Sequence, residues 1–172
     1  PKQFAAHEDL GRYPRDEDGD VLKLGKAGSH LIYLPEPEEI YPAGFCTTVS
    51  LTGPAKAGLE DKFRPQFFDG VTTVVAKLFI QTGADYAMFG EKDYQQMKVV
   101  TRMARDLDIP IEVVGVPTVR EDDGLAKSSR NVYLSKQERQ QALAIYSSIS
   151  HAAERIRGGL DIQSAARLAT RT

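Results

Sequence analysis

The chain has 172 residues, which is the size of one ordinary domain and enough to bury a hydrophobic core. Its net charge is −2 and its basic and acidic residues are interleaved, so the sequence lacks the basic patch that a nucleic-acid partner would need. No apolar run reaches membrane-spanning length, and no signal-peptide pattern is present. The single cysteine, Cys46, excludes an intrachain disulfide and favours a reducing cytoplasm.

The first third of the chain predicts one helix and two short strands. An acidic run at 16–20, followed by apolar residues and then by Gly28, matches the charge and capping preferences of a helix. Residues His30–Leu34 predict a short buried strand, and Ile40–Gly44 predict a turn. Apolar residues alternate with polar ones over Phe45–Leu51, which predicts a second strand with a threonine-rich face.

The middle of the chain alternates between helical and strand patterns. Asp69 is placed to cap a helix that ends near Gln81, with Gly83 just beyond it. A strand at Tyr86–Phe89 follows, then a helix over Glu91–Leu107 and an apolar strand at Ile111–Val116. The apolar character of the last strand is typical of a sheet that is covered on both faces. This alternation predicts an α/β domain with parallel strands.

The last third of the chain predicts a loop and two helices. Polar residues over Thr118–Asn131 indicate a long loop. Ser135 and Glu138 have the spacing of a capping box for a helix through about Arg157, and Asp161 can cap one more short helix. We therefore expect an α/β domain over residues 1–134 and the beginning of a smaller domain over residues 135–172.

The segment 89–96, FGEKDYQQ, follows a predicted strand and opens a predicted helix. Ligands of open parallel sheets bind beyond the carboxyl ends of the strands, where helix N-termini favour anions. Gly90 lets a ligand approach the backbone, and Lys92 is suited to phosphate. Asp93 and Gln96 share one face of the first helical turn and can hold hydroxyl groups. The alternative is a capped surface helix with solvated charges.

The segment 124–131, GLAKSSRN, combines a glycine, two hydroxyl groups and two cations. Ser128 and Ser129 can donate hydrogen bonds to phosphate oxygens, and Arg130 can bind two of these oxygens at once. The pattern is not that of a P-loop, and a polar surface loop is the alternative. At neighbouring strand ends, the two segments together favour a site for a nucleotide or an acidic substrate.

These segments closely resemble the pantothenate synthetase family. The resemblance rests on FGEKDYQQ, on the run over 113–135 that contains GLAKSSRN, on PKQF at the start, on IYPAG at 40–44 and on a match over 64–79. It implies a Rossmann-like nucleotidyltransferase α/β fold with a small C-terminal α+β domain. It also implies an ATP-dependent condensation of pantoate with β-alanine through a pantoyl adenylate, with release of pyrophosphate and AMP.

The resemblance assigns roles to individual residues. The implied ATP-binding residues are Gly90, Lys92, Asp93, Val116, Lys127, Ser128, Ser129 and Arg130, of which Lys92, Ser128, Ser129 and Arg130 are the implied catalytic residues. Gln3, Gln96 and Arg64 match positions that contact pantoate, and Asp20 lies near an acid for Mg²⁺. A cytoplasmic homodimer is implied, with no nucleic-acid or membrane partner.

The sequence departs from the family pattern in several places. The H-x-G-H signature, which precedes PKQF in the family, is absent, and the C-terminal domain is begun but not completed. Phe67 stands where the family often has histidine, and Lys127 stands where an apolar residue is usual. We therefore expect a fragment that is impaired when alone. Two alternatives stay open: a nucleotide- or pantoate-binding module without turnover, and another adenylyl-transferring enzyme of the same superfamily.

Overall fold

The computed structural model describes residue 11 and residues 13–170. The chain divides into two compact units at Pro117/Thr118, earlier than the boundary at 134/135 that the sequence predicts. The division falls there because the loop after Thr118 bonds to the helix that follows it, as in the ion pair between Asp123 and Arg139. Each unit is described by itself below.

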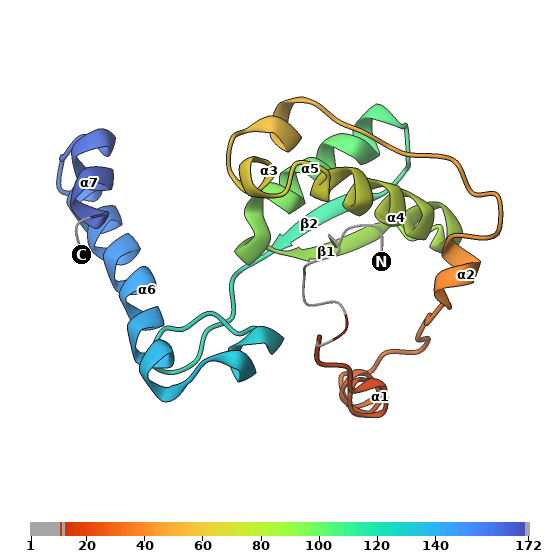
Figure 1. Cartoon of the computed structure of the whole chain (residues 1–172), viewed down its shortest axis with the longest axis horizontal. Coiled ribbons are helices and arrows are strands. Elements are labelled where there is room, and N and C mark those ends of the chain that lie inside the picture. Colours follow the sequence, from red (N-terminus) through yellow and green to blue (C-terminus); the bar gives the residue numbers. More distant parts are fainter. Residues whose placement is uncertain (1–10, 12, 171–172) are drawn as a thin grey trace. The chain divides into compact units, whose positions relative to one another are not determined.

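The first unit contains a two-stranded sheet and several helices (Figure 1). Its strands are β1 (Tyr86–Gly90) and β2 (Glu112–Val116). Its helices are α1 (Glu17–Lys26), α2 (Pro37–Ile40), η2 (Gly53–Lys56), α3 (Glu60–Phe63), α4 (Phe67–Thr82), η3 (Glu91–Asp93) and α5 (Tyr94–Asp106). The second unit contains η4 (Ser129–Tyr133), α6 (Lys136–Arg157) and α7 (Ile162–Ala169). None of the described helices is both long and apolar enough for a membrane span.

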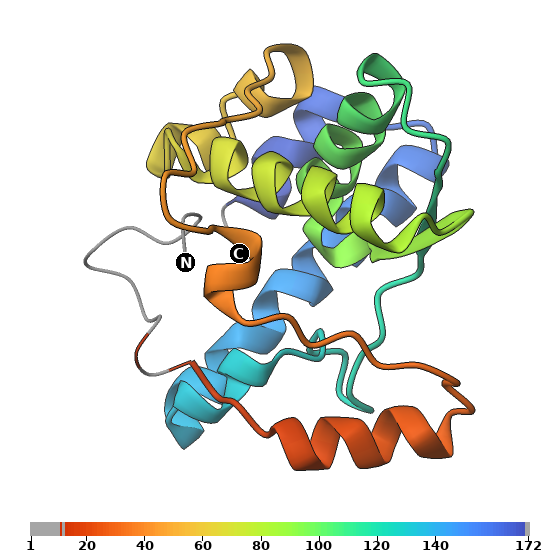
Figure 2. The same ribbon diagram turned by 90° about the vertical axis from the view of Figure 1, so that its right-hand side faces the viewer.

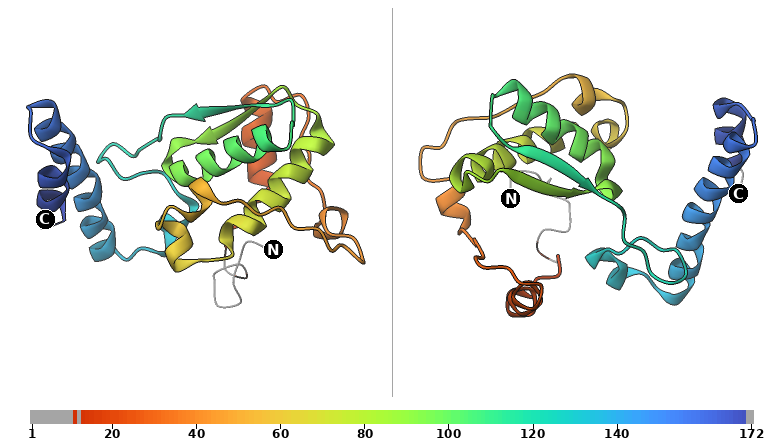
Figure 3. Two further views of the ribbon diagram at one scale, coloured as in Figure 1. Left: turned by 90° about the horizontal axis from the view of Figure 1, so that it is seen from above. Right: turned by 180° about the vertical axis from the view of Figure 1, so that it is seen from behind.

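The two strands are parallel, and α5 connects them, which confirms the predicted α/β class. The helices α4 and α5 lie on one face of this sheet (Figure 3). Ala87 and Phe89 of β1 pack against the core, whereas Tyr86 and Met88 are exposed. The expectation of a sheet covered on both faces is therefore wrong for the part of the chain that the structure describes.

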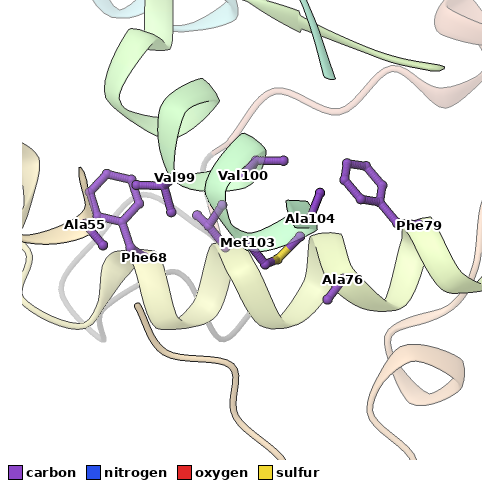
Figure 4. Packing of buried hydrophobic residues seen from close by; sticks show 9 residues of the cluster. Ala55, Phe68, Ala76, Phe79, Val99, Val100, Met103 and Ala104 are labelled. Carbon is purple, nitrogen blue, oxygen red and sulfur yellow. The ribbon is translucent and has the colours of Figure 1, made fainter. Parts of the chain in front are cut away.

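The core is the contact between α4 and α5 (Figure 4). The apolar stripe of α4 places Val71, Ala76 and Phe79 toward Val99, Val100, Met103 and Ala104 of α5. The helix α4 begins two residues before the predicted cap, so Asp69 lies inside its first turn. There the Asp69 carboxylate accepts a hydrogen bond from the Ser50 hydroxyl. Gly83 ends α4 in the left-handed conformation, as predicted for a C-cap glycine.

Replacement of Met103 by alanine is expected to lower the free energy of unfolding by about 2–5 kcal/mol, because the side chain is fully buried and leaves a cavity. Met88 provides a matched control, since its side chain is 62% exposed on β1. Met88→Ala is expected to change the same free energy by less than about 0.5 kcal/mol. Urea unfolding followed by circular dichroism measures both, and equal losses would contradict the assignment of the core.

Both strands predicted before residue 52 are wrong: His30–Leu34 and Phe45–Leu51 form no strand in the described structure. Leu31 is 84% exposed, so the first segment has no buried face. In the second segment, the Val49 amide donates to the Thr73 hydroxyl at 3.0 Å, and the Thr72 hydroxyl donates to the Val49 carbonyl at 2.6 Å. Two side chains of α4 thus take the place of a neighbouring strand. Figure 2 shows this extended stretch, in orange, between α2 and the gold turn before α4.

The helices of the second unit follow the sequence closely. Ser135 and Glu138 form the predicted capping box, and α6 ends at the predicted Arg157. Asp161 caps α7 by accepting a hydrogen bond from the Ser164 amide. The helix starts were predictable because the capping signals involve residues only three positions apart.

The capping box makes the stability of α6 dependent on pH. Hydrogen bonds from Ser135 lower the pKa of Glu138 below its ordinary value of 4.5. A depressed pKa means that the stabilisation is present above pH 4.5 and is lost as the pH falls through the folded-state pKa. We expect Ser135→Ala to raise the pKa of Glu138 toward 4.5. Carboxyl chemical shifts in an NMR titration measure it, and an unchanged pKa would contradict the capping role.

Candidate nucleotide-binding site

The carboxyl ends of β1 and β2 lie side by side. Gly90 and Val116 are direct partners at this end of the parallel sheet. A Cβ atom built on Gly90 would meet no atom within 4 Å, so the space beside this residue is open. Because both strands end at the same edge and a helix follows, this edge has the position at which α/β sheets bind their ligands. Two residues of the predicted ATP site, Gly90 and Val116, are thus adjacent.

Lys92 and Asp93 extend from the turn that follows β1. The Lys92 ammonium lies 3.5 Å from an Asp93 carboxylate oxygen, and the two side chains are 41% and 64% exposed. An exposed ion pair of this length contributes little to stability. Asp93 precedes α5 without capping it through its side chain. Both charged groups can therefore turn toward a ligand at the edge of the sheet at small cost.

Arg64 lies between an acid and an aromatic ring. Its Nη1 donates to the Glu60 carboxylate at 3.0 Å, and its guanidinium carbon lies 3.9 Å from the centre of the Phe67 ring. A guanidinium at this distance above a ring gains a cation–π attraction. Phe67, the departure from the family pattern, therefore contacts the predicted pantoate-binding arginine directly.

Gln95, which the sequence does not single out, connects two segments of the candidate site. Its amide bonds to Pro54, Glu60 and Asp61, which connects the first turn of α5 to the chain around α3. The hydrogen bond from Gln95, supported by backbone amides of nearby residues, lowers the pKa of the Asp61 carboxyl. The paired glutamines of FGEKDYQQ were the available signal. The neighbouring Gln96, which is half-buried on α5, is the one that the resemblance assigns to pantoate.

Two further residues that the resemblance assigns to the site are Asp20 and Gln3. Asp20 is exposed on α1, and its carboxylate is 3.0 Å from the Lys23 ammonium. Among the described residues, no three histidine, cysteine, aspartate or glutamate side chains are close enough to hold a metal ion. These residues do not fit a protein-built Mg²⁺ site, and a contact of Asp20 with Mg²⁺ stays a prediction. Gln3 lies outside the described residues.

In the second unit, the predicted phosphate-binding loop directly follows a tight hairpin. Arg120 and Ala126 form an antiparallel bridge, and the Lys127 amide donates to the Val119 carbonyl at 2.9 Å. The hydroxyl of Ser128 then accepts from the Arg130 amide at 3.2 Å and caps η4. Backbone and side-chain hydrogen bonds therefore order this loop. It contains all four residues that the resemblance assigns to phosphate binding in this unit, Lys127 to Arg130.

Two contacts fasten this hairpin to α6. Arg139 forms an ion pair with Asp123 at 2.7 Å. The Arg120 guanidinium stacks at 3.7 Å on the Tyr146 ring and donates to the Gly124 carbonyl at 3.1 Å. Gly124 has a φ of +95°, and an added Cβ would lie 2.7 Å from the Tyr146 ring. Gly124 therefore has a structural role in this turn, which requires glycine.

Comparisons with known proteins identify the family of this chain. The family model described as Pantoate-beta-alanine ligase matches residues 1–172. A protein of Rhodopseudomonas palustris strain BisA53 named pantothenate synthetase is 56% identical over 165 residues, which cover 96% of this chain and 58% of the relative. Its counterpart from Caulobacter vibrioides is 55% identical over 98% of this chain and 59% of its own length. The chain thus spans somewhat more than half of these relatives.

Solved structures give the same result. The pantothenate synthetase of Thermus thermophilus is 50% identical and has a TM-score of 0.95, over 99% of this chain and 62% of that protein. The Francisella tularensis ligase, described as complexed with β-γ ATP and β-alanine, is 33% identical with a TM-score of 0.79, over 86% of this chain and 56% of that protein. These similarities confirm the nucleotidyltransferase-like α/β fold, and the chain belongs to the pantoate–β-alanine ligase family.

Proposed function

We propose that this chain forms the central ATP- and pantoate-binding part of a pantoate–β-alanine ligase. The observation that carries the proposal is the pairing of Gly90 with Val116 at the carboxyl edge of the sheet, with Lys92, Asp93 and Gln96 directly after it. The Francisella tularensis relative is described with β-γ ATP and β-alanine bound, which supports ATP as a ligand of this family, whereas the assignment of pantoate follows from the resemblance.

In the first step, a carboxylate oxygen of pantoate attacks the α-phosphorus of ATP. The new phosphorus–oxygen bond forms as the bond to the bridging oxygen breaks, and pyrophosphate leaves with the electron pair. The carboxylate needs no general base, because it is already a nucleophile. It is repelled by the triphosphate, so Lys92 and Arg130 lower the barrier by supplying positive charge where negative charge grows.

In the second step, the amine of β-alanine attacks the acyl carbon of the pantoyl adenylate. An amide bond forms, AMP leaves and the amine releases its proton. Gln3, Gln96 and Arg64 hold pantoate in place through both steps, so that positioning provides much of the acceleration. Asp93 binds the ribose, Val116 offers its backbone to adenine, and Lys127, Ser128 and Ser129 bind the phosphates beside Arg130.

Three further parts of the proposal follow from the resemblance to the family. ATP enters as its Mg²⁺ complex, so the metal arrives with the substrate. The protein works in the cytoplasm, in keeping with a single cysteine. It assembles as a homodimer.

Pyrophosphate release from ATP, with and without pantoate, tests the proposal. Two proteins are compared: the 172-residue chain, and the same chain extended at both ends with the flanking segments of the Caulobacter vibrioides relative. We expect pantoate-dependent release from the extended protein and little or none from the shorter chain. ATP binding without release by a folded extended protein would favour a binding module. Release that ignores pantoate would favour another adenylyl-transferring enzyme.

A further inference from the structure

We propose that Gln95 is a positioning residue, which fixes the pantoate-binding arginine relative to the segment that binds ATP. A single side-chain amide joins the first turn of α5 to the chain that carries Glu60, and Glu60 holds Arg64. Figure 1 shows α3, in gold, beside the start of α5. The geometric part of this inference stands by itself, and its catalytic consequence rests on the proposed function.

All three bonds of Gln95 have good geometry. Its Oε1 accepts from the Glu60 amide at 2.9 Å, and its Nε2 donates to the Pro54 carbonyl at 3.0 Å and to an Asp61 carboxylate oxygen at 3.0 Å. The orientation of the amide is fixed, because a flipped amide would set an oxygen against two acceptors. Both N–H groups are used within the protein, so this side chain supports the site without donating to a ligand.

Asp61 extends the connection into the neighbouring turn. Its carboxylate also accepts from the Gly58 amide at 3.0 Å and from the Leu59 amide at 3.1 Å. Pro54 lies in η2, whose Ala55 is buried in the core. The Gln95 amide therefore joins a segment anchored in the core on one side to the turn at 58–61 on the other.

Glu60 in turn holds the Arg64 side chain in place. The ion pair between them closes one helical turn at 3.0 Å, and the Phe67 ring covers the guanidinium from α4. A long arginine side chain otherwise samples many rotamers, and a group already held in place loses less freedom when substrate binds. Misplacement of Glu60 would therefore misplace Arg64, although Gln95 does not touch it.

Gln95→Glu is the most informative variant. The introduced carboxylate can still accept from the Glu60 amide, but its second oxygen faces the Pro54 carbonyl and the Asp61 carboxylate. An isolated glutamate titrates near pH ~4.3, and a neighbouring carboxylate raises this value. Once protonated, the introduced carboxyl can donate one hydrogen bond again. The defect should therefore be present at high pH and partly reversed at low pH.

Hydrogen exchange on the 172-residue chain tests the geometry without any activity. We expect the Gly58 and Glu60 amides of Gln95→Glu to exchange at least about tenfold faster than in the parent at pH ~8, after correction for intrinsic rates, since repulsion between the introduced carboxylate and Asp61 raises the population of open states of this turn. The excess should shrink toward pH ~5, where the introduced carboxyl gains its proton. Gln95→Leu should lose protection equally at both pH values. Gln141→Glu, an exposed change on α6, is the matched control and should leave both amides unchanged.

Steady-state kinetics on the extended protein test the consequence. We expect Gln95→Glu to lower kcat/KM for pantoate roughly 10- to 100-fold, as small misplacements of a positioning group do, with KM for ATP changed less than about twofold. The loss for pantoate should also diminish at low pH. Normal exchange at Gly58 and Glu60 in both Gln95 variants would overturn the inference. So would equal effects on pantoate and ATP with no recovery at low pH. Should the extended parent protein release no pyrophosphate, the proposed function fails, and the exchange measurement still decides the geometry.

Discussion

Lys92→Ala is expected to lower pantoate-dependent pyrophosphate release by the extended protein about 100- to 1,000-fold, with little change in unfolding free energy. The rate falls because the ammonium would stabilise the negative charge that grows on the departing pyrophosphate, and the loss of one such group typically has this effect. Stability is retained because the side chain is 41% exposed and its contact with Asp93 is long. A coupled assay for pyrophosphate, with thermal unfolding in parallel, measures both quantities.

Lys98 is the matched control for this prediction. It is exposed on α5, with its ammonium 5.1 Å from the centre of the Tyr94 ring. Lys98→Ala removes the same charge from α5, the helix that directly follows the η3 turn of Lys92, so a general electrostatic effect would appear in both variants. We expect Lys98→Ala to keep the parent rate within about twofold, as exposed substitutions away from a site usually do. Similar losses in both variants would remove Lys92 from the catalytic role.

Gly124→Ala is expected to destabilise the second unit by about 1–3 kcal/mol and to weaken ATP binding by the extended protein. Alanine is strained at a φ of +95°, and its Cβ would come 2.7 Å from the Tyr146 ring. If Tyr146 moves, the Arg120 guanidinium loses the ring on which it stacks. The hairpin that leads into Ser128 would then be held less firmly. Chemical denaturation and ATP titration calorimetry measure the two effects.

The control for this change is another glycine replaced by alanine. Gly25 lies inside α1, where an added Cβ meets no atom within 4 Å. Gly25→Ala is expected to stabilise the chain by about 0.5–1 kcal/mol, because alanine favours the helix. The double variant Gly124→Ala/Tyr146→Ala removes the steric contact and keeps the backbone strain. Parent-like stability of Gly124→Ala would show that the turn does not need glycine.

Local structure, such as the start of a helix, was predicted better from the sequence than the partner against which an extended segment packs. The start of α6 followed from Ser135 and Glu138, which are neighbours along the chain. The strand predicted at Phe45–Leu51 failed because alternation reports a half-buried extended chain and does not identify its partner. Its partner here is a pair of threonine hydroxyls on α4, and no periodic signal marks them.

The candidate site shows the same division. The residues that touch the edge of the sheet, such as Gly90 and Lys92, followed from short motifs at strand ends. The residues that hold these elements in place did not, because Gln95 meets partners 34 to 41 positions away in the chain. The contact of the Gly124 turn with Tyr146 also joins residues that are not neighbours along the chain. Such contacts depend on folding, which brings distant segments together.

The Phe67 ring beside Arg64 affects how the orientation of the Arg64 side chain depends on pH. A histidine, which the family often has at this position, changes charge near pH ~6.5 and would place a cation against the guanidinium in acid. Phe67 has no proton to gain and attracts the guanidinium equally well on either side of neutrality. The Arg64 side chain of this protein should therefore keep its orientation across a pH range in which a histidine-bearing relative would change its own.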